Sequence, residues 1–406
     1  MRLLVLVSLS LVALTASARI VPAKDPLDGV LDADLVVIVG PALNGKPGAF
    51  RISEVFLGDL HVGDTIELSD FKLFIVQEYG PEKVEPITAE TRILLYLRRT
   101  KDSPPTWKPT YFEESFFWVQ RAQDEGLLRR AAERTIDVRR QWEAADNISD
   151  PKQRVAALWP YLSLFTYGVS FFKHTVAELR KARPASGEYF AAHFDGMSHG
   201  ERMLLLPEAG NFGSDQLHEK LKRDLELQEH GYEDFISGSG KRAADIEWDT
   251  MPSSAKDEAG EIYYGLAGLS KFEDRTDLPF IRATALWCAK YHLEQAASAA
   301  VNAFRDMPDQ GNLPIIDALL REFLPGRKVG MWSIDWDAER ALCRHKYIKT
   351  VPVLAPFVAD PITQLAGEAE ICLKEIVGQD LGRDPTRWQE WYKEKTKSET
   401  DHTAQE

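Results

Sequence analysis

The feature that most constrains the fold of this chain is a proline-centred pattern that recurs in its C-terminal half. The segments TDLPFI, GNLPII and KTVPVL place Pro279, Pro314 and Pro352 two residues after a polar residue, at separations of 35 and 38 residues. A polar N-cap, proline in the first turn and apolar residues after it are the features of a helix start. A period of this length is typical of two-helix units that stack into a solenoid. The N-cap candidates are Asp277, Asn312 and Thr350.

One unit is nearly complete in the sequence TVPVLAPFVADPITQLAGEAEICLKEIVG, which spans residues 350–378. It predicts a first helix over 351–358, a turn at ADP, and a second helix over 364–377 that ends at Gly378. This segment resembles a HEAT-type repeat. The resemblance implies an architecture, an armadillo-like superhelix, and no particular chemistry.

The predicted helical repeat domain covers residues 126–406. The sequence RVAALWPYL at 154–162 resembles a further repeat start, whereas the middle part, 181–257, fits the pattern poorly. We therefore expect either an insertion or degenerate repeats there.

The C-terminal sequence GRDPTRWQEWYKEK continues the series. Pro385 lies 33 residues after Pro352, and Asp384 is an N-cap candidate for a terminal helix over 384–395. The remaining chain suffices for one helix and not for a pair, so we expect an end cap with an apolar inner face. The aromatic residues on that face are Trp388, Trp391 and Tyr392.

The N-terminal quarter has a different sequence pattern, which is typical of short strands separated by clusters of Gly, Pro, Asn and Asp. Its β-branched and aromatic runs predict a small antiparallel barrel or sandwich over residues 19–125. The fold class is therefore α+β, with a small β domain followed by an all-α solenoid. The five predicted strands are 34–39, 49–58, 63–68, 92–97 and 115–120.

The segments ADLVVIVG, FRISEVFLGDLHVGDTIEL and TRILLYLRR resemble the netrin-like module, an OB-type barrel, as it occurs in secreted bacterial proteins. In the animal tissue inhibitors of metalloproteinases, that module uses an N-terminal cysteine to chelate zinc. This chain has no cysteine before Cys288, so the resemblance carries no zinc-chelating activity over to it.

The first 18 residues, MRLLVLVSLSLVALTASA, have the pattern of a secretory signal peptide. Arg2 precedes an apolar run, and Ala16 and Ala18 form a small-residue cleavage site. The apolar run is too short to span a bilayer, which needs roughly 20 residues. We expect an exported protein, periplasmic or extracellular, with no stable membrane insertion after cleavage.

The net charge of the chain limits the classes of partner that we expect it to bind. A formal net charge of -14 argues against nucleic acid or an anionic membrane surface as the main partner. The uncharged stretch over 155–172 has the length of a membrane span, but Pro160 and Gly168 dilute it, and we expect a buried helix pair there instead.

Three cysteines, Cys288, Cys343 and Cys372, lie in the C-terminal half. Three do not make a disulfide framework. One bridge plus a free thiol is one interpretation, and small buried core cysteines are the other. The sequence leaves open whether Cys343 pairs with Cys372.

Two short motifs resemble catalytic signatures without meeting their requirements. ISGSGKRAAD, residues 236–245, departs from a P-loop at Phe235 and Arg242, and we expect a solvated loop. Ser253 and Lys256 have the serine–lysine spacing of penicillin-recognising enzymes, but the companion motifs are absent from the sequence.

Two residue groups are candidates for binding. The segment HFDGMSHGER offers imidazole and carboxylate groups to a first-row metal, although solvated or capping roles are favoured. The segment WKPTYFEESFFWV offers an aromatic platform for a sugar, although core packing is favoured. The metal candidates are His193, Asp195, His199 and Glu201, and the aromatic candidates are Trp107, Tyr111 and Trp118.

The sequence thus assigns no catalytic, cofactor-binding or metal residue. The favoured interpretation is a non-enzymatic exported binding or scaffold protein whose solenoid surface contacts a protein or peptide. The alternative is an extracytoplasmic enzyme or accessory domain that acts on polysaccharide or peptide.

Overall fold

The computed structural model describes residues 29–42, 48–68, 88–101, 106–110, 116–119, 121–166, 169–326 and 334–403. The signal-peptide pattern at residues 1–18 lies outside these ranges. The chain forms two compact units, residues 1–182 and 183–406. In the described residues, the first unit contains a β-sheet and the α-helices α3 to α5, and the second unit is helical, which confirms the predicted α+β layout.

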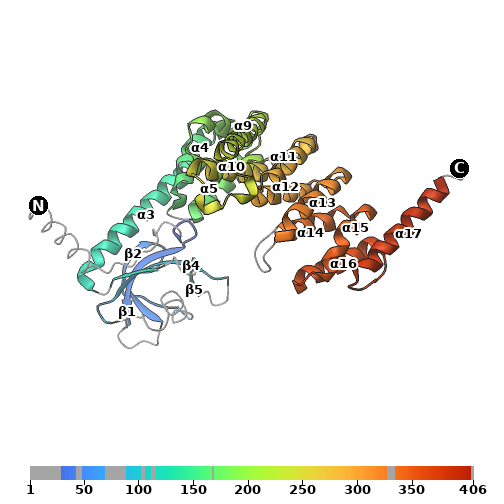
Figure 1. The fold of residues 1–406 in the computed structure, drawn as a ribbon. Helices are drawn as coiled ribbons and strands as arrows, with labels where there is room; N and C mark the ends of the chain where they lie inside the picture. The colour runs from blue at the N-terminus through green and yellow to red at the C-terminus, as the bar shows by residue number, and fades with distance from the viewer. Residues whose placement is uncertain are drawn as a thin grey trace, which may run out of the picture. The chain divides into compact units, whose positions relative to one another are not determined.

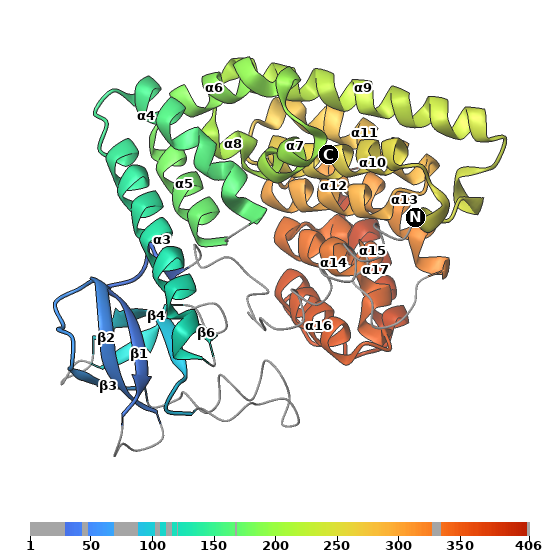
Figure 2. The same ribbon diagram turned by 90° about the vertical axis from the view of Figure 1, so that its left-hand side faces the viewer.

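The sheet of the first unit is antiparallel and curled (Figure 2). Its strand order is β3-β2-β1-β4-β5. The sixth strand, β6, pairs with β4 next to β5. Five of these strands match the predicted runs, whereas the sequence analysis missed β5, which is short and contains Pro109. The strands are β1 (Leu35–Pro41), β2 (Ala49–Leu57), β3 (Thr65–Glu67), β4 (Arg92–Arg99), β5 (Trp107–Pro109) and β6 (Phe116–Val119).

Strand β1 is buried on both faces, which explains why its apolar run is continuous and does not alternate. Leu35, Val37 and Val39 belong to the core enclosed by the curl of the sheet. Val36 and Ile38 point the other way and are equally buried. Helix α3 (Glu125–Asp146) contacts β1, β2, β4 and β6 and covers the sheet.

Polar bonds fix α3 against the sheet at two levels. The buried hydroxyls of Tyr96 and Thr135 lie 2.9 Å apart. One turn further along α3, the Arg139 guanidinium donates to the backbone carbonyls of Val30, at 2.8 Å, and Ala33, at 2.7 Å. These bonds join buried polar groups of the sheet unit to the helix, as is usual for polar groups that are buried.

The helices that follow α3 in the first unit are short. The uncharged stretch 155–172 runs through α4 (Pro151–Leu158), the 3₁₀ segment Trp159–Thr166 and α5 (Val169–Lys181). Trp142 of α3 donates to the Thr175 hydroxyl of α5 at 2.9 Å. Among the residues that the structure describes, no helix has the length and apolar character needed to cross a membrane.

The second unit begins with the part of the chain that fitted the repeat pattern poorly. Residues 181–257 are nevertheless mostly helical, and the long helix α9 packs against α10. The helices of this part are α6 (Ala185–His193), α7 (His199–Leu205), α8 (Ala209–Phe212), α9 (Asp215–Ser239) and α10 (Ser253–Ser270).

From residue 278 onward the helices come in the predicted pairs. Pro279, Pro314 and Pro352 each occupy the second position of the first helix of a pair. One row of the stack contains α10, α12, α14 and α16, each in contact with the next (Figure 1). We call this the inner row. The pairs are α11 (Leu278–Lys290) with α12 (Glu294–Asp306), α13 (Leu313–Phe323) with α14 (Ile334–His345), and α15 (Val351–Leu354) with α16 (Thr363–Val377).

The predicted N-cap side chains have a different role. Asp277, Asn312 and Thr350 stand at the N-cap positions, but none of their side chains caps its helix. A 3₁₀ turn precedes each helix, and the first two turns are capped by Asp274 and Asp309. The predicted side chains are buried instead, because the 3₁₀ turn rotates them toward the body of the stack.

The chain ends as predicted, on a single helix, α17 (Pro385–Thr403), which extends beyond the expected residue 395. Trp388 is fully buried, and its indole N–H donates to the Gly382 carbonyl at 2.7 Å. Gly378 closes α16 with a φ of 78°, and Gly382 has a φ of 72° in the following turn. Helix α17 packs against α15 and the 3₁₀ segment Ala355–Ala359 and so covers the last helix pair described.

We predict that Trp388→Ala lowers the free energy of unfolding by about 3 kcal/mol, because it leaves a cavity and orphans the Gly382 carbonyl. Urea denaturation followed by circular dichroism measures this change. The matched control is Trp248→Ala, since Trp248 is 49% exposed, and it should change stability by no more than about 0.5 kcal/mol. Equal stabilities of the two variants would contradict the end-cap role.

Candidate functional site

The four metal candidates from the sequence do not converge. His193 Nδ1 lies 2.8 Å from its own helix carbonyl at Tyr189. Asp195 forms an ion pair with Lys220 at 2.6 Å. Each of these side chains therefore has a separate partner.

The remaining two candidates follow the same pattern. Glu201 and Ser198 form a reciprocal capping box at the start of α7, which lowers the pKa of the Glu201 carboxyl through the Ser198 hydroxyl and backbone N–H. His199 turns away from Glu201 and pairs with Glu261 and Asp257. The capping interpretation fits this segment.

The other sequence motifs also have structural roles. Residues 236–239 form the last turn of α9 and not a loop, and Gly240 ends this helix in the left-handed conformation. A phosphate-binding loop lies before the N-terminus of a helix, whereas this motif begins in the last turn of α9. Ser253 and Lys256 lie in the first turn of α10. Lys256 donates to the Asp249 carbonyl at 3.4 Å.

The aromatic candidates do not define a platform. Trp107 of β5 is partly buried against the core of the sheet, and the Arg99 guanidinium lies 5.0 Å from its ring centre. Tyr111 lies outside the described residues, as does the side chain of Trp118. Core packing fits Trp107.

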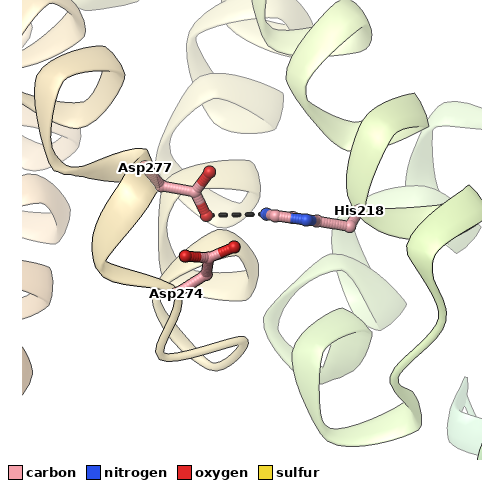
Figure 3. Close-up of side chains that lie close together, drawn as sticks. All are labelled: His218, Asp274 and Asp277. Atoms are coloured by element: carbon pink, nitrogen blue, oxygen red, sulfur yellow. Dashed lines mark hydrogen bonds and ion pairs between the residues drawn. The ribbon is translucent and has the colours of Figure 1, made fainter.

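Within the described part of the chain, one histidine–carboxylate group converges closely enough to hold a metal ion. The group consists of His218 of α9 and two aspartates, Asp274 and Asp277, at the turn before α11 (Figure 3). Their ligand atoms lie within 4.8 Å of one another. The buried Asp277 carboxylate lies 2.6 Å from His218 Nε2. Its other oxygen lies 3.0 Å from the Lys222 ammonium.

The Lys222 ammonium supplies the positive charge that the Asp277 carboxylate needs, and this ion pair raises the pKa of Lys222. Asp274 is already engaged as the cap of its own turn. A metal ion would have to displace a charged lysine from a buried partner, which is costly. We assign this group a structural role: it fixes the first proline-started pair to α9.

A second buried polar group lies among α7, α9 and α10. Glu261 is 1% exposed and accepts from Arg202 at 2.8 Å and from His199. The buried Asp224 carboxyl lies nearby without a basic partner of its own among the described residues. Its burial, and then the charge of Glu261, raise the pKa of Asp224 to about 6.

The second unit contains a groove of about 810 Å³. It runs across the inner row, from the end of α10 over α12 and α14 to α16. Its lining carries five basic and five acidic side chains, together with a cysteine pair and an isoleucine. These residues are Lys271, Glu273, Arg305, Asp306, Glu339, Arg340, Cys343, Arg344, Lys346, Glu368, Ile371, Cys372 and Glu375.

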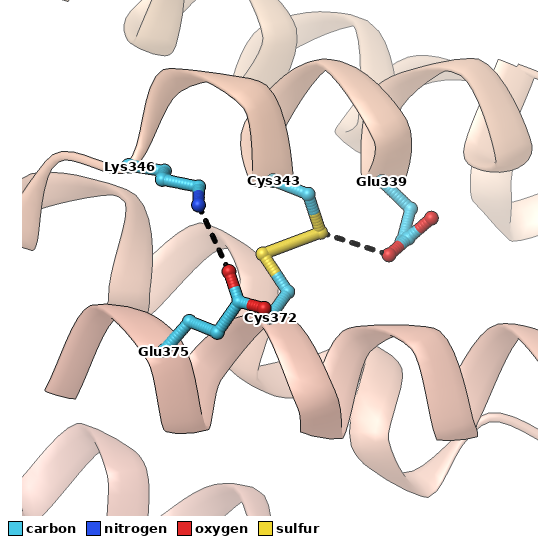
Figure 4. The surroundings of a disulfide bond; sticks show 5 residues. All are labelled: Glu339, Cys343, Lys346, Cys372 and Glu375. Carbon is cyan, nitrogen blue, oxygen red and sulfur yellow. Dashed lines mark hydrogen bonds and ion pairs between the residues drawn. A yellow bond between two sulfur atoms is a disulfide. The ribbon is translucent and has the colours of Figure 1, made fainter. Parts of the chain in front are cut away.

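A disulfide lies in the lining of this groove (Figure 4). Cys343 of α14 and Cys372 of α16 are bonded, with their Cα atoms 5.5 Å apart. The pair joins two successive helices of the inner row, and the Lys346–Glu375 ion pair, at 2.9 Å, joins the same helices beside it. Cys288 is a buried free thiol, and its burial raises its pKa.

The groove contains one carboxyl group in an unusual setting. Glu339 of α14 is 1% exposed, and one of its oxygens lies 3.0 Å from Cys343 Sγ (Figure 4). The other oxygen has no hydrogen-bond partner among the described residues. Burial, and then the charge of Glu368, raise the pKa of Glu339 to about 7.

Glu339 is not among the candidate residues predicted from the sequence. The signal that was available is its position four residues before Cys343 on a helix, which places both side chains on one face. The burial of Glu339 depends on α16, and nothing local in the sequence specifies that contact.

Comparison with known protein families, with curated proteins and with solved structures finds no match to this chain.

The pKa of Asp224 is 3.8 in the unfolded chain and is raised to about 6 in the folded protein. The folded protein therefore holds this proton more tightly, so the free energy of unfolding is highest below pH 4 and falls as the pH rises through about 6. We predict that Asp224→Asn removes this loss. The variant should gain about 2 kcal/mol over the wild type between pH 4 and pH 7. Urea denaturation at a series of pH values measures the difference. Asp234→Asn, at an exposed site on the same helix, is the control and should show no such trend.

Proposed function

We propose that this chain is an exported, non-enzymatic binding or scaffold protein whose helical repeat surface contacts a protein or peptide. The observation that carries this proposal is the mixed-charge groove along the inner row. An extended concave surface across successive helix pairs is how solenoid proteins bind their partners. Export to the periplasm or the extracellular space rests on the signal-peptide pattern at residues 1–18.

The finer architectural assignment belongs to the same proposal. The helix pairs are HEAT-like, as their period and proline starts indicate. The sheet is netrin-like, of OB type, on the strength of its strand segments and curled antiparallel form. In this proposal the sheet offers a second contact surface and no metal chemistry.

The charges in the groove define where a partner binds. Half of the charged side chains are paired within the groove, in the Lys271–Asp306, Arg305–Asp306 and Lys346–Glu375 ion pairs. Arg344 is exposed and forms no ion pair with any described residue. Ile371, in the same lining, is 60% exposed. A partner segment with a carboxylate and an apolar side chain complements these two groups.

We expect a photo-crosslinking residue at position 371 to capture a partner in the native host, because this position lies in the groove. The control is the same residue at Leu227, which is 68% exposed on α9 and outside the groove lining. Mass spectrometry of the adducts identifies the captured protein, which is then purified. Equal capture at both positions would argue against the groove as the binding surface.

The purified partner permits a quantitative test. We expect Arg344→Glu to weaken its binding about tenfold in calorimetry, as for loss of a charge-assisted hydrogen bond. Arg223→Glu, an equivalent charge reversal at an exposed position of α9, should leave binding unchanged. If Arg344→Glu binds as tightly as the wild type, the groove is not the contact surface.

A further inference from the structure

The Cys343–Cys372 disulfide has a position that differs from that of a purely structural cross-link. Both cysteines line the groove, and Cys343 is the more exposed of the two, since Cys372 is only 7% exposed. A small molecule or side chain that enters the groove therefore meets the sulfur of Cys343. Access of this kind is one of the conditions for thiol–disulfide exchange.

The second observation is the carboxyl group of Glu339. Its one described side-chain contact is with Cys343 Sγ, at 3.0 Å, and its other oxygen is buried without a partner. A disulfide sulfur has no proton to donate, so an ionised Glu339 would be unsatisfied in the oxidised protein. A thiol at Cys343 would donate to the ionised carboxylate. Glu339 is thus better satisfied when the disulfide is open.

We propose that the Cys343–Cys372 pair is a thiol–disulfide exchange site that accepts a dithiol in the groove, with Glu339 as the acid that protonates the Cys343 sulfur. This proposal is independent of which protein the groove binds. Below pH 7, the raised pKa of Glu339, about 7, keeps the proton on this carboxyl while the disulfide is closed.

The exchange proceeds in two steps. A thiolate of the dithiol attacks Cys343 Sγ, the S–S bond breaks, and Cys372 leaves as a thiolate that takes a proton from solvent. The second thiol of the dithiol then attacks the mixed disulfide and releases Cys343, which takes the proton of Glu339. The dithiol is oxidised to a disulfide, and the protein pair is reduced by two electrons.

The proton balance gives this proposal a measurable signature. The dithiol gives up two protons and the cysteine pair takes up two, one of them from Glu339. One proton therefore remains in solution and Glu339 is left ionised, so higher pH favours the reduced protein. Exchange without Glu339 releases no net proton and has no such dependence.

The experiment uses the full chain equilibrated with reduced and oxidised dithiothreitol, without denaturant, between pH 5 and pH 8. Acid quenching, alkylation and mass spectrometry count the thiols of Cys343 and Cys372. We expect the exchange constant to rise by up to about tenfold per pH unit below pH 7 and to level off above it. A wild-type constant that does not change with pH, or a disulfide that dithiothreitol does not open, would overturn the proposal.

Two variants test whether Glu339 is the group that supplies the proton to Cys343. Glu339→Gln keeps the shape of the side chain and should give a constant exchange equilibrium over the same pH range. The charges that act on Glu339 are those of Glu368 on α16 and Arg340 on its own helix, and the same lining contains the Arg305–Asp306 pair of α12. Glu368→Gln removes one of these charges and should keep the pH-dependent rise. A rise that persists in Glu339→Gln would assign the proton to another group.

Discussion

The second unit depends on the close packing of α12 between its neighbours in the inner row. This helix contacts α10 on one side, α14 on the other, and its partner α11. Seven of its thirteen residues are buried, and most of these buried side chains are small, with Phe304 near the end of the helix. The buried alanines are Ala296, Ala297, Ala299, Ala300 and Ala303. Larger residues at these sites would hold the three helices apart and cost the dispersion contacts of all of them.

Close packing also constrains the sequence where the first helices of the second unit contact the inner row. A Cβ on Gly268 of α10 would lie 1.9 Å from the Leu206 carbonyl oxygen, so only glycine fits there. Asp277 fixes the next pair to α9 through His218 and Lys222. Asn312 repeats this arrangement one pair later, where it accepts from Arg282 at 2.8 Å. Asp277 and Asn312 therefore each join a proline-started helix to the helices before it, whereas the buried Thr350 hydroxyl has no hydrogen-bond partner among the described residues.

These contacts explain which parts of the fold were predictable from the sequence. Proline two positions after a polar residue fixes a helix start locally, and the helix starts at Pro279, Pro314, Pro352 and Pro385 are confirmed. The direction in which Asp277 and Asn312 point depends on a 3₁₀ turn and on the preceding helix pair, so their assignment as caps was wrong. Glu339 was missed for the same reason, since helix α16 creates its environment.

The cross-link between α14 and α16 adds a different kind of stability from the packing of α12. Closing the loop between Cys343 and Cys372, with a separation of 29 residues, stabilises the fold by on the order of 3 to 4 kcal/mol through the unfolded chain. Opening the disulfide removes this contribution.

The row from α10 to α14 is packed without the disulfide, and α17 still covers the last helix pair through Trp388. The loss therefore falls on the α14–α16 contact, where the Lys346–Glu375 pair and the remaining apolar surface hold the two helices together. Because that contact forms one wall of the groove, the redox state of the cysteines and the shape of the binding surface are physically linked.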